Sequence, residues 1–296
     1  MMENVGFHIV KAWVRFLSVH PYWLLYLKSD CYYFLMYHML RYRRRVVRQN
    51  LLRSFPDKDI SEIKRIERRF YQNLCDLFVE APKTLDTSPN GFKKRITITN
   101  LELVTRLYEQ HKNIFYAIPH SGNWEWFGKL ICDLTPQKSL AVYKRVKNPV
   151  FERLMYYMRT KDCSLEMVES NSTLRRLAQL RDTQTAVLMM ADQTSYGLAQ
   201  DYWTEFLHQD TCWFTGIERI AKKLDYAVVF VDMIRKGRGR YEITFSLITD
   251  TPTEAATGEI MEPYVRNVER FIEANPDNWL WSHRRWKHER PKIEEA

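Results

Sequence analysis

Residues 113–126 read Asn-Ile-Phe-Tyr-Ala-Ile-Pro-His-Ser-Gly-Asn-Trp-Glu-Trp, and this stretch decides the expected fold. Its first residues form an apolar run typical of a buried strand, which stops at Pro119. A short turn follows, in which polar side chains are suited to cap a helix that begins near Trp124. The stretch therefore predicts a strand, a tight turn and a helix. It places His120 at the carboxyl end of the strand and Glu125 in the first helical turn.

Strands and helices alternate along the chain from residue 92 onward. The strands carry no polar face, which is typical of a parallel sheet covered by helices on both sides. The sequence therefore predicts an α/β fold with a mostly parallel sheet flanked by helices. The expected strands span residues 95–99, 113–118, 140–143, 165–168, 186–190, 227–231 and 241–247. The expected helices span residues 101–110, 124–134, 149–160, 172–182, 215–224 and 259–274.

Residues 4–40 are rich in leucine and aromatic side chains, and a basic run follows at residues 41–48. Pro21 and several polar residues interrupt the apolar stretches, which disfavours a full membrane span. Aromatic residues followed by arginines favour helices that lie in a membrane interface, with the arginines near anionic lipid. The alternative is a pair of core helices with a solvated basic end. We therefore expect membrane-associating helices at residues 1–48 and one α/β domain at residues 49–296.

The chain of 296 residues carries a net charge of +9, which implies an acidic partner. Charge alone leaves three classes open, namely nucleic acid, an anionic membrane surface, and an acidic protein or substrate. The five cysteines are scattered and form no C-x-x-C pair, which disfavours a disulfide framework and a cysteine metal site. We expect them to be buried thiols in a reducing compartment. The dispersed histidines predict no metal site, and no secretory signal is evident.

His120 and Glu125 are the first candidates for catalysis, because α/β sheets bind ligands at the carboxyl ends of their strands. A carboxylate beside Nδ1 of a histidine fixes the tautomer and stabilises the imidazolium, which leaves Nε2 as a general base. We expect Glu125 to supply that carboxylate. On spacing alone, the alternative is that His120 makes only structural hydrogen bonds within a loop. Glu125 would then be present because a carboxylate is favourable at a helix N-terminus.

Four ordered blocks of the sequence resemble a known family. Residues 120–125, His-Ser-Gly-Asn-Trp-Glu, resemble the H-x-x-x-x-[DE] signature of glycerolipid-type (lysophospholipid) acyltransferases, and more closely that of the lipid A biosynthesis (late) acyltransferases. Residues 142–149, Val-Tyr-Lys-Arg-Val-Lys-Asn-Pro, are similar to that family's Y-[RK]-P-x-x-N block, which Arg159 follows at the usual distance. Residues 191–193, Ala-Asp-Gln, match its D-Q block, and residues 279–287 resemble its W-x-H-R-R-[FW]-K block.

The resemblance implies a glycerolipid acyltransferase-like fold and a membrane-associated O-acyltransferase. Such an enzyme moves a fatty acyl chain from an acyl-carrier-protein thioester to a hydroxyl of a lipid A precursor, with no acyl-enzyme, cofactor or metal. His120 is then the general base and Glu125 the residue that orients it. Asp192 is expected to orient a neighbouring cation. The resemblance assigns substrate binding to Lys144, Arg145, Asn148, Arg159, Asp192, Gln193, His283 and Arg284.

The resemblance also implies partners and a location. The donor is acyl carrier protein, and the acceptor is an anionic glycolipid or phospholipid at a membrane surface, on the cytoplasmic face of the bacterial inner membrane. Within the same chemistry, the alternative acceptor is a lysophospholipid or an aminolipid. From other classes, the alternatives are a catalytically inactive lipid-binding scaffold and a basic nucleic-acid-binding protein. The latter would gather arginines and aromatic residues on one surface and lack a buried His–Glu pair, so no nucleic acid is expected.

Overall fold

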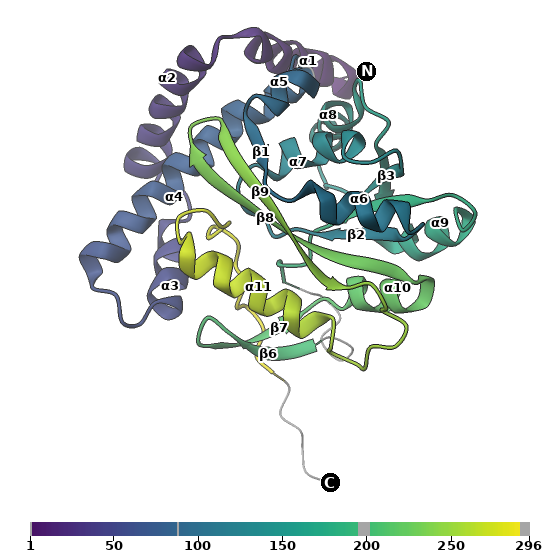
Figure 1. Cartoon of the computed structure of the whole chain (residues 1–296). Coiled ribbons are helices and arrows are strands. Elements are labelled where there is room, and N and C mark those ends of the chain that lie inside the picture. Colours follow the sequence, from purple (N-terminus) through teal and green to yellow (C-terminus); the bar gives the residue numbers. More distant parts are fainter. Residues whose placement is uncertain (1, 88, 195–201, 291–296) are drawn as a thin grey trace.

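The computed structural model describes residues 2–87, 89–194 and 202–290, and its centre is a seven-stranded sheet (Figure 1). The strand order is β1-β9-β8-β2-β5-β3-β4. Neighbouring strands pair in parallel, except that β8 and β9 form an antiparallel hairpin. This arrangement confirms the expected α/β fold. The strands are β1 (Ile96–Ile98), β2 (Asn113–Ala117), β3 (Lys138–Tyr143), β4 (Glu166–Glu169), β5 (Thr185–Met189), β8 (Tyr226–Gly237) and β9 (Arg240–Thr249).

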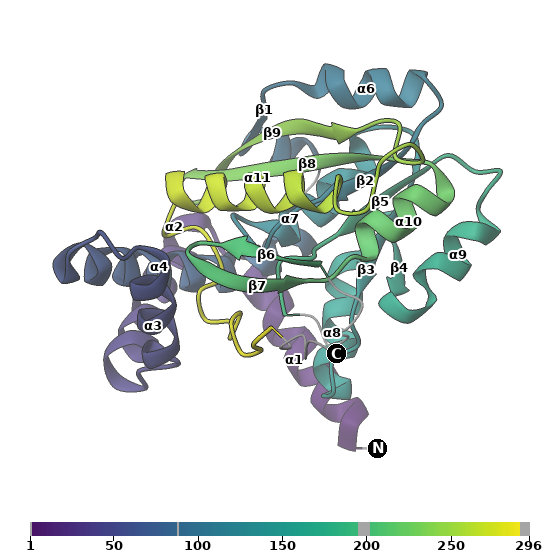
Figure 2. The same ribbon diagram turned by 90° about the horizontal axis from the view of Figure 1, so that it is seen from below.

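Apolar side chains cover both faces of the central strands. Along β2, alternate side chains of residues 114–117 enter two separate cores, and all four are fully buried. This two-sided burial explains why the strand reads as a continuous apolar run. Figure 2 shows α6 and a small hairpin, β6–β7, on opposite sides of the sheet. The first core includes residues of α10 (Gly216–Leu224) and α11 (Met261–Ala274), and the second includes residues of α6 (Leu101–Glu109) and α7 (Trp124–Leu130).

The hairpin of β6 (Tyr202–Phe206) and β7 (Gln209–Trp213) is an element that the sequence did not predict. Its turn consists of Leu207 and His208, with positive φ angles of 50° and 62°. Turns of this kind usually carry glycine, asparagine or aspartate, so the usual signal is absent. The hairpin contributes Phe206 and Trp213 to the first core, where both are fully buried.

The N-terminal region is helical, as expected, and it packs on later helices. α2 lies along α4, and α1 lies against α8. Pro21 separates α1 from α2, and a π-helical segment (Phe34–Met39) continues α2. No helix within the described residues is both long and apolar enough to cross a membrane. The remaining helices are α1 (Met2–Val19), α2 (Tyr22–Tyr33), α3 (Arg44–Ser54), α4 (Ile60–Glu80), α5 (Pro89–Lys93), α8 (Pro149–Thr160) and α9 (Thr173–Gln179).

Two buried carboxylates on α4 tie α2 to the rest of the fold. Asp76 accepts a hydrogen bond from Ser29 Oγ at 2.6 Å. Glu80 accepts from Tyr26 Oη at 3.0 Å and from Tyr241 Oη of β9 at 2.6 Å. Burial raises the pKa of the Glu80 carboxyl group. Because buried polar groups are costly without partners, these bonds fix the position of α2 relative to α4 and β9.

Candidate active site

His120 lies just beyond β2, at the carboxyl end of the strand, as the sequence predicted. Asp192 follows β5, the parallel neighbour of β2. His120 Nδ1 lies 2.6 Å from Asp192 Oδ1, and the backbone N–H of His120 donates to Asp192 Oδ2 at 2.8 Å. The carboxyl ends of parallel neighbours meet at one edge of a sheet. The fold therefore joins two residues that are 72 positions apart.

Asp192 is almost completely buried and is held by three hydrogen-bond donors. The third is Trp279 Nε1, which donates to Oδ2 at 2.8 Å. Burial by itself raises the pKa of a carboxyl group, but His120 and these hydrogen bonds outweigh it and hold the pKa of Asp192 below its ordinary value. Asp192 is therefore a carboxylate that accepts a hydrogen bond from the Nδ1–H of His120.

The second ring nitrogen of His120 meets Gln193. Gln193 Nε2 lies 3.2 Å from His120 Nε2, and an amide –NH₂ group only donates, so His120 Nε2 is the acceptor. The lone pair that a general base requires is therefore on Nε2. The His120 side chain keeps 16% of its surface exposed, and it lines a cavity, so a substrate hydroxyl can replace the amide.

The structure corrects the expected partner of His120 Nδ1, which is not Glu125. The Glu125 carboxylate instead makes a bidentate pair with Arg159 of α8, at 2.9 Å (Nε to Oε2) and 2.6 Å (Nη2 to Oε1). Asn123 caps α7 by accepting from the Trp126 N–H at 3.1 Å, and the first turn that it starts directs Glu125 toward α8. Burial lowers the pKa of Arg159, but Glu125 outweighs burial and the net pKa is raised. The expected cation partner of Asp192 is likewise replaced by a histidine.

A cavity of about 280 Å³ opens beside His120, between α7, α8 and the ends of β3 and β5. Its deeply buried lining is apolar and includes Ala141, Leu165 and Leu188. Charged groups lie along the same cavity, among them the Glu125–Arg159 pair and Lys144. The site therefore offers an apolar space for a hydrocarbon chain and charged groups for a polar or anionic head.

Five of the eight expected substrate-binding residues do not line this cavity within the described structure, namely Arg145, Asn148, Asp192, His283 and Arg284. Arg145 is exposed and pairs with Glu169. Asn148 caps α8, since its Oδ1 accepts from the backbone N–H groups of Val150 at 3.0 Å and Phe151 at 3.1 Å. Asn148 thus positions α8, several of whose side chains line the cavity, rather than touching a substrate there.

The C-terminal block, residues 279–287, does not line the cavity within the described structure. It contacts Asp192 instead, through the hydrogen bond from Trp279 Nε1. Burial lowers the pKa of His283 to about 4, so its imidazole is neutral, and Arg284 is exposed. The buried cation of the block is Arg285, which donates from Nη2 to the Cys212 carbonyl oxygen at 2.7 Å. Sequence reasoning missed the roles of Arg285 and Trp279, although both belong to the block that carried the family resemblance.

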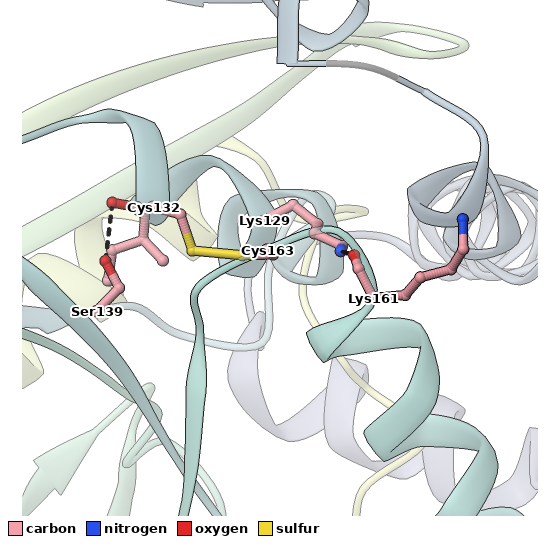
Figure 3. The surroundings of a disulfide bond; sticks show 6 residues. Lys129, Cys132, Ser139, Lys161 and Cys163 are labelled. Atoms are coloured by element: carbon pink, nitrogen blue, oxygen red, sulfur yellow. Dashed lines mark hydrogen bonds between the residues drawn. A yellow bond between two sulfur atoms is a disulfide. The ribbon is translucent and has the colours of Figure 1, made fainter.

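The structure corrects the expectation of buried thiols for three of the five cysteines, because Cys132 and Cys163 form a disulfide (Figure 3) and Cys31 is exposed; Cys75 and Cys212 are buried thiols, as expected. The bond joins the helical turn after α7 to the segment after α8. Lys129 donates to the Lys161 carbonyl oxygen between the same two segments (Figure 3). Burial lowers the pKa of Lys129 to about 8. The pairing depends on the packing of α7 beside α8, for which the sequence carries no local signal.

The disulfide is expected to stabilise this wall of the cavity. The Cys132→Ser/Cys163→Ser double variant should lose about 3 kcal/mol of unfolding free energy, because the bond closes a loop across 31 positions in the unfolded chain. Urea denaturation measures this loss, with Cys31→Ser, which removes an exposed free thiol, as the control. Dithiothreitol should destabilise the wild-type protein equally and leave the double variant unchanged. An identical urea midpoint in the wild type and the double variant would contradict a stabilising bond.

Fold and site together define a class of enzyme, namely one that holds a His–Asp pair beside an apolar cavity at the carboxyl edge of an α/β sheet. Residues 1–288 match the model of the bacterial lipid A biosynthesis acyltransferases, and the chain belongs to that family. The match confirms the resemblance read from the four blocks. The protein is accordingly an acyltransferase enzyme of lipid A biosynthesis. A comparison with curated proteins finds no match.

Proposed function

We propose that the protein moves a fatty acyl chain from an acyl-carrier-protein thioester to a hydroxyl of a lipid A precursor, at the cytoplasmic face of the bacterial inner membrane. The observation that carries the proposal is the setting of His120. Its Nδ1 is held by the buried Asp192, and the residue lines a cavity with apolar and charged walls. Membership of the family supports a lipid A-type acceptor.

The reaction that this geometry supports is a direct acyl transfer. His120 Nε2 takes the proton of the acceptor hydroxyl, and the oxygen attacks the thioester carbonyl carbon. The tetrahedral intermediate collapses by breaking the carbon–sulfur bond, and Nε2 gives its proton to the departing sulfur, which leaves as the carrier thiol. Asp192 stabilises the imidazolium between these two proton transfers. An ester forms, a thioester breaks, and no covalent bond to the protein is required.

The cations of the cavity support the binding of negative charge. Arg159 and Lys144 line the same cavity as His120. Glu125 holds the Arg159 guanidinium in a fixed orientation through two hydrogen bonds, so Glu125 acts on the reaction through Arg159. A fixed cation near the reacting carbonyl stabilises a developing oxyanion or binds an acceptor phosphate without reorganising.

Exposed apolar side chains support attachment to a membrane interface. On α1 and α2, Trp13 and Trp23 expose 51% and 69% of their surface. On α8, Phe151 and Tyr156 are about half exposed and also line the cavity, and α1 packs against this helix. Exposed aromatic side chains of this kind favour the headgroup level of a bilayer. The cavity would then open beside the membrane that holds the acceptor lipid.

Charging the apolar face of α1 is expected to release the protein from membranes. The Ile9→Glu/Trp13→Glu variant replaces two exposed apolar side chains with carboxylates, which anionic lipid repels. Sedimentation with vesicles that contain phosphatidylglycerol should show at least a tenfold lower bound fraction. Leu101→Glu/Leu247→Glu, two exposed leucines on α6 and β9, is the matched control and should bind as the wild type does. Equal binding by both variants would overturn the interfacial role of α1.

A comparison of acceptors tests the proposed substrate. Purified wild-type protein receives one acyl-carrier thioester together with a lipid A precursor, a lysophospholipid or an aminolipid. We expect an acylated product with the lipid A precursor and only background with the others. Transfer confined to the lysophospholipid or the aminolipid would refute the proposed acceptor but not the proposed acyl transfer.

A further inference from the structure

Most of the net charge of the chain lies on one pair of helices. Residues 41–69 hold eleven lysines and arginines against four acidic residues, a net charge of +7 out of the +9 of the whole chain. The segment comprises the turn before α3, α3 itself and the first half of α4. In Figures 1 and 2, α3 and the start of α4 project on the side of the molecule away from α8 and the N-terminus. This basic hairpin is therefore separate from the apolar surface of α1 and α8.

A groove of about 630 Å³ on this hairpin is lined by arginines. Glu67, a fully buried carboxylate of α4, holds two of them, Arg44 at 3.3 Å and Arg48 at 2.7 Å. Arg41 and Arg45 also line the groove and have no carboxylate within ion-pair distance among the described residues. The groove is completed by Gln49 and the half-exposed Leu52. The groove therefore offers two guanidinium groups held in place by Glu67, two without an ion-pair partner among the described residues, and one apolar side chain. This combination suits an acidic protein surface.

α4, whose Glu67 holds two arginines of the groove without lining it, continues toward His120. Arg69, Asn73 and Leu77 follow one another at intervals of four residues, so they share one face of α4. Asn73 and Leu77 line a shallow cleft that also contains His120 and does not coincide with the larger cavity. From Glu67 to Leu77 the helix rises roughly 15 Å. His120 thus borders both the cavity and this small cleft of about 20 Å³ beside α4.

We propose that the basic hairpin docks the acidic acyl carrier protein and that its thioester-bearing arm reaches His120 along α4. The inference rests on the proposed donor. The acceptor lipid then enters from the cavity side, where the apolar surface of α1 and α8 lies, and the two substrates meet at His120 from opposite directions. An anionic bilayer is the competing occupant of the groove. Exposed apolar side chains of Met39 and Leu40, directly before Arg41, would also suit a bilayer. The separation of the hairpin from α1 and α8, and the cleft between α4 and His120, favour the carrier protein.

Charge reversal on the hairpin tests the proposal. In Arg45→Glu/Arg69→Glu, two exposed cations become anions. The KM for the acyl-carrier thioester should rise about tenfold or more at an unchanged kcat, because opposed charges are replaced by like charges in the encounter. The KM for acyl-pantetheine, a donor without the acidic protein, should stay within twofold of the wild-type value. Arg106→Glu/Lys223→Glu reverses two exposed cations on α6 and α10 and serves as the control of equal net charge.

Three other results are decisive. Equal KM values for the carrier thioester in both double variants would overturn the docking surface. So would a hairpin variant that loses binding to phosphatidylglycerol vesicles but keeps the wild-type KM in detergent micelles, since the groove would then bind lipid. The absence of transfer by the wild-type protein from both donors would instead refute the proposed function itself. These outcomes separate a failure of the docking surface from a failure of the donor assignment.

Discussion

Replacing His120 with alanine is expected to lower kcat by about 10³- to 10⁴-fold, the upper part of the range of about 10² to 10⁴ that a positioned general base contributes. The physical reason is that no other described side chain combines a free lone pair with a place in both the cavity and the α4 cleft. The KM for the acyl donor should change little, because the imidazole contributes to the transition state rather than to binding of the chain. Steady-state kinetics with the carrier thioester and a lipid A precursor measure both constants.

The variant needs a control for folding, because His120 is half of a buried contact with Asp192. The backbone N–H at position 120 still bonds Asp192 in the alanine variant, so the melting temperature should fall by only a few degrees. His111→Ala, an exposed histidine remote from the site, is the matched variant and should retain wild-type kcat. A His120→Ala protein that is folded and keeps more than a tenth of wild-type kcat would overturn the role of His120.

Replacing Asp192 with asparagine is expected to produce the second largest loss, about 10² to 10⁴ in kcat. The amide group of asparagine donates where the carboxylate accepted, which favours the wrong tautomer of His120 and removes the charge that stabilises the imidazolium. Trp279 still finds an acceptor oxygen in the variant, so the fold should survive. Steady-state kinetics at several pH values give kcat, and circular dichroism checks the fold.

Glu125→Gln is the informative comparison, because the sequence pointed to Glu125 and the structure points to Asp192. The glutamine keeps the shape of Glu125 but weakens its pair with Arg159. We expect a loss of about 10-fold to 100-fold, expressed mainly in the KM for the acceptor, because a positioned cation is disturbed while the base stays intact. A Glu125→Gln variant that loses kcat as severely as Asp192→Asn, at unchanged KM, would restore Glu125 as the partner of His120.

Much of the fold could be predicted, because its signals are local. The apolar run at residues 113–118 is a strand with two buried faces, and its expected position agrees closely with β2. The β6–β7 hairpin was not predictable in this way. Its turn residues, Leu207 and His208, have positive φ angles, which usually occur at glycine, asparagine or aspartate. The disulfide between Cys132 and Cys163 could not be predicted either, because it depends on the packing of α7 against α8.

The site shows the same division between local and distant signals. The turn after β2 placed His120 at a strand end, which is local information. The partner of His120 depends on the strand order, since Asp192 is adjacent only because β5 pairs with β2. Spacing favoured Glu125, five positions away, but the cap at Asn123 sets the first turn of α7 so that Glu125 faces Arg159. Distance along the chain was therefore a poor guide to which carboxylate orients the base.

The central claim is that His120, oriented by Asp192, passes the acyl chain directly from carrier to lipid. A single-turnover experiment with a radiolabelled acyl-carrier thioester and a lipid A precursor tests it most directly. In the wild-type protein the label should move from carrier to lipid with none on the protein at any time, and in Asp192→Asn the same step should be slower by about 10² or more. Label that accumulates on the wild-type protein before it reaches the lipid, or equal transfer rates in both proteins, would contradict the account.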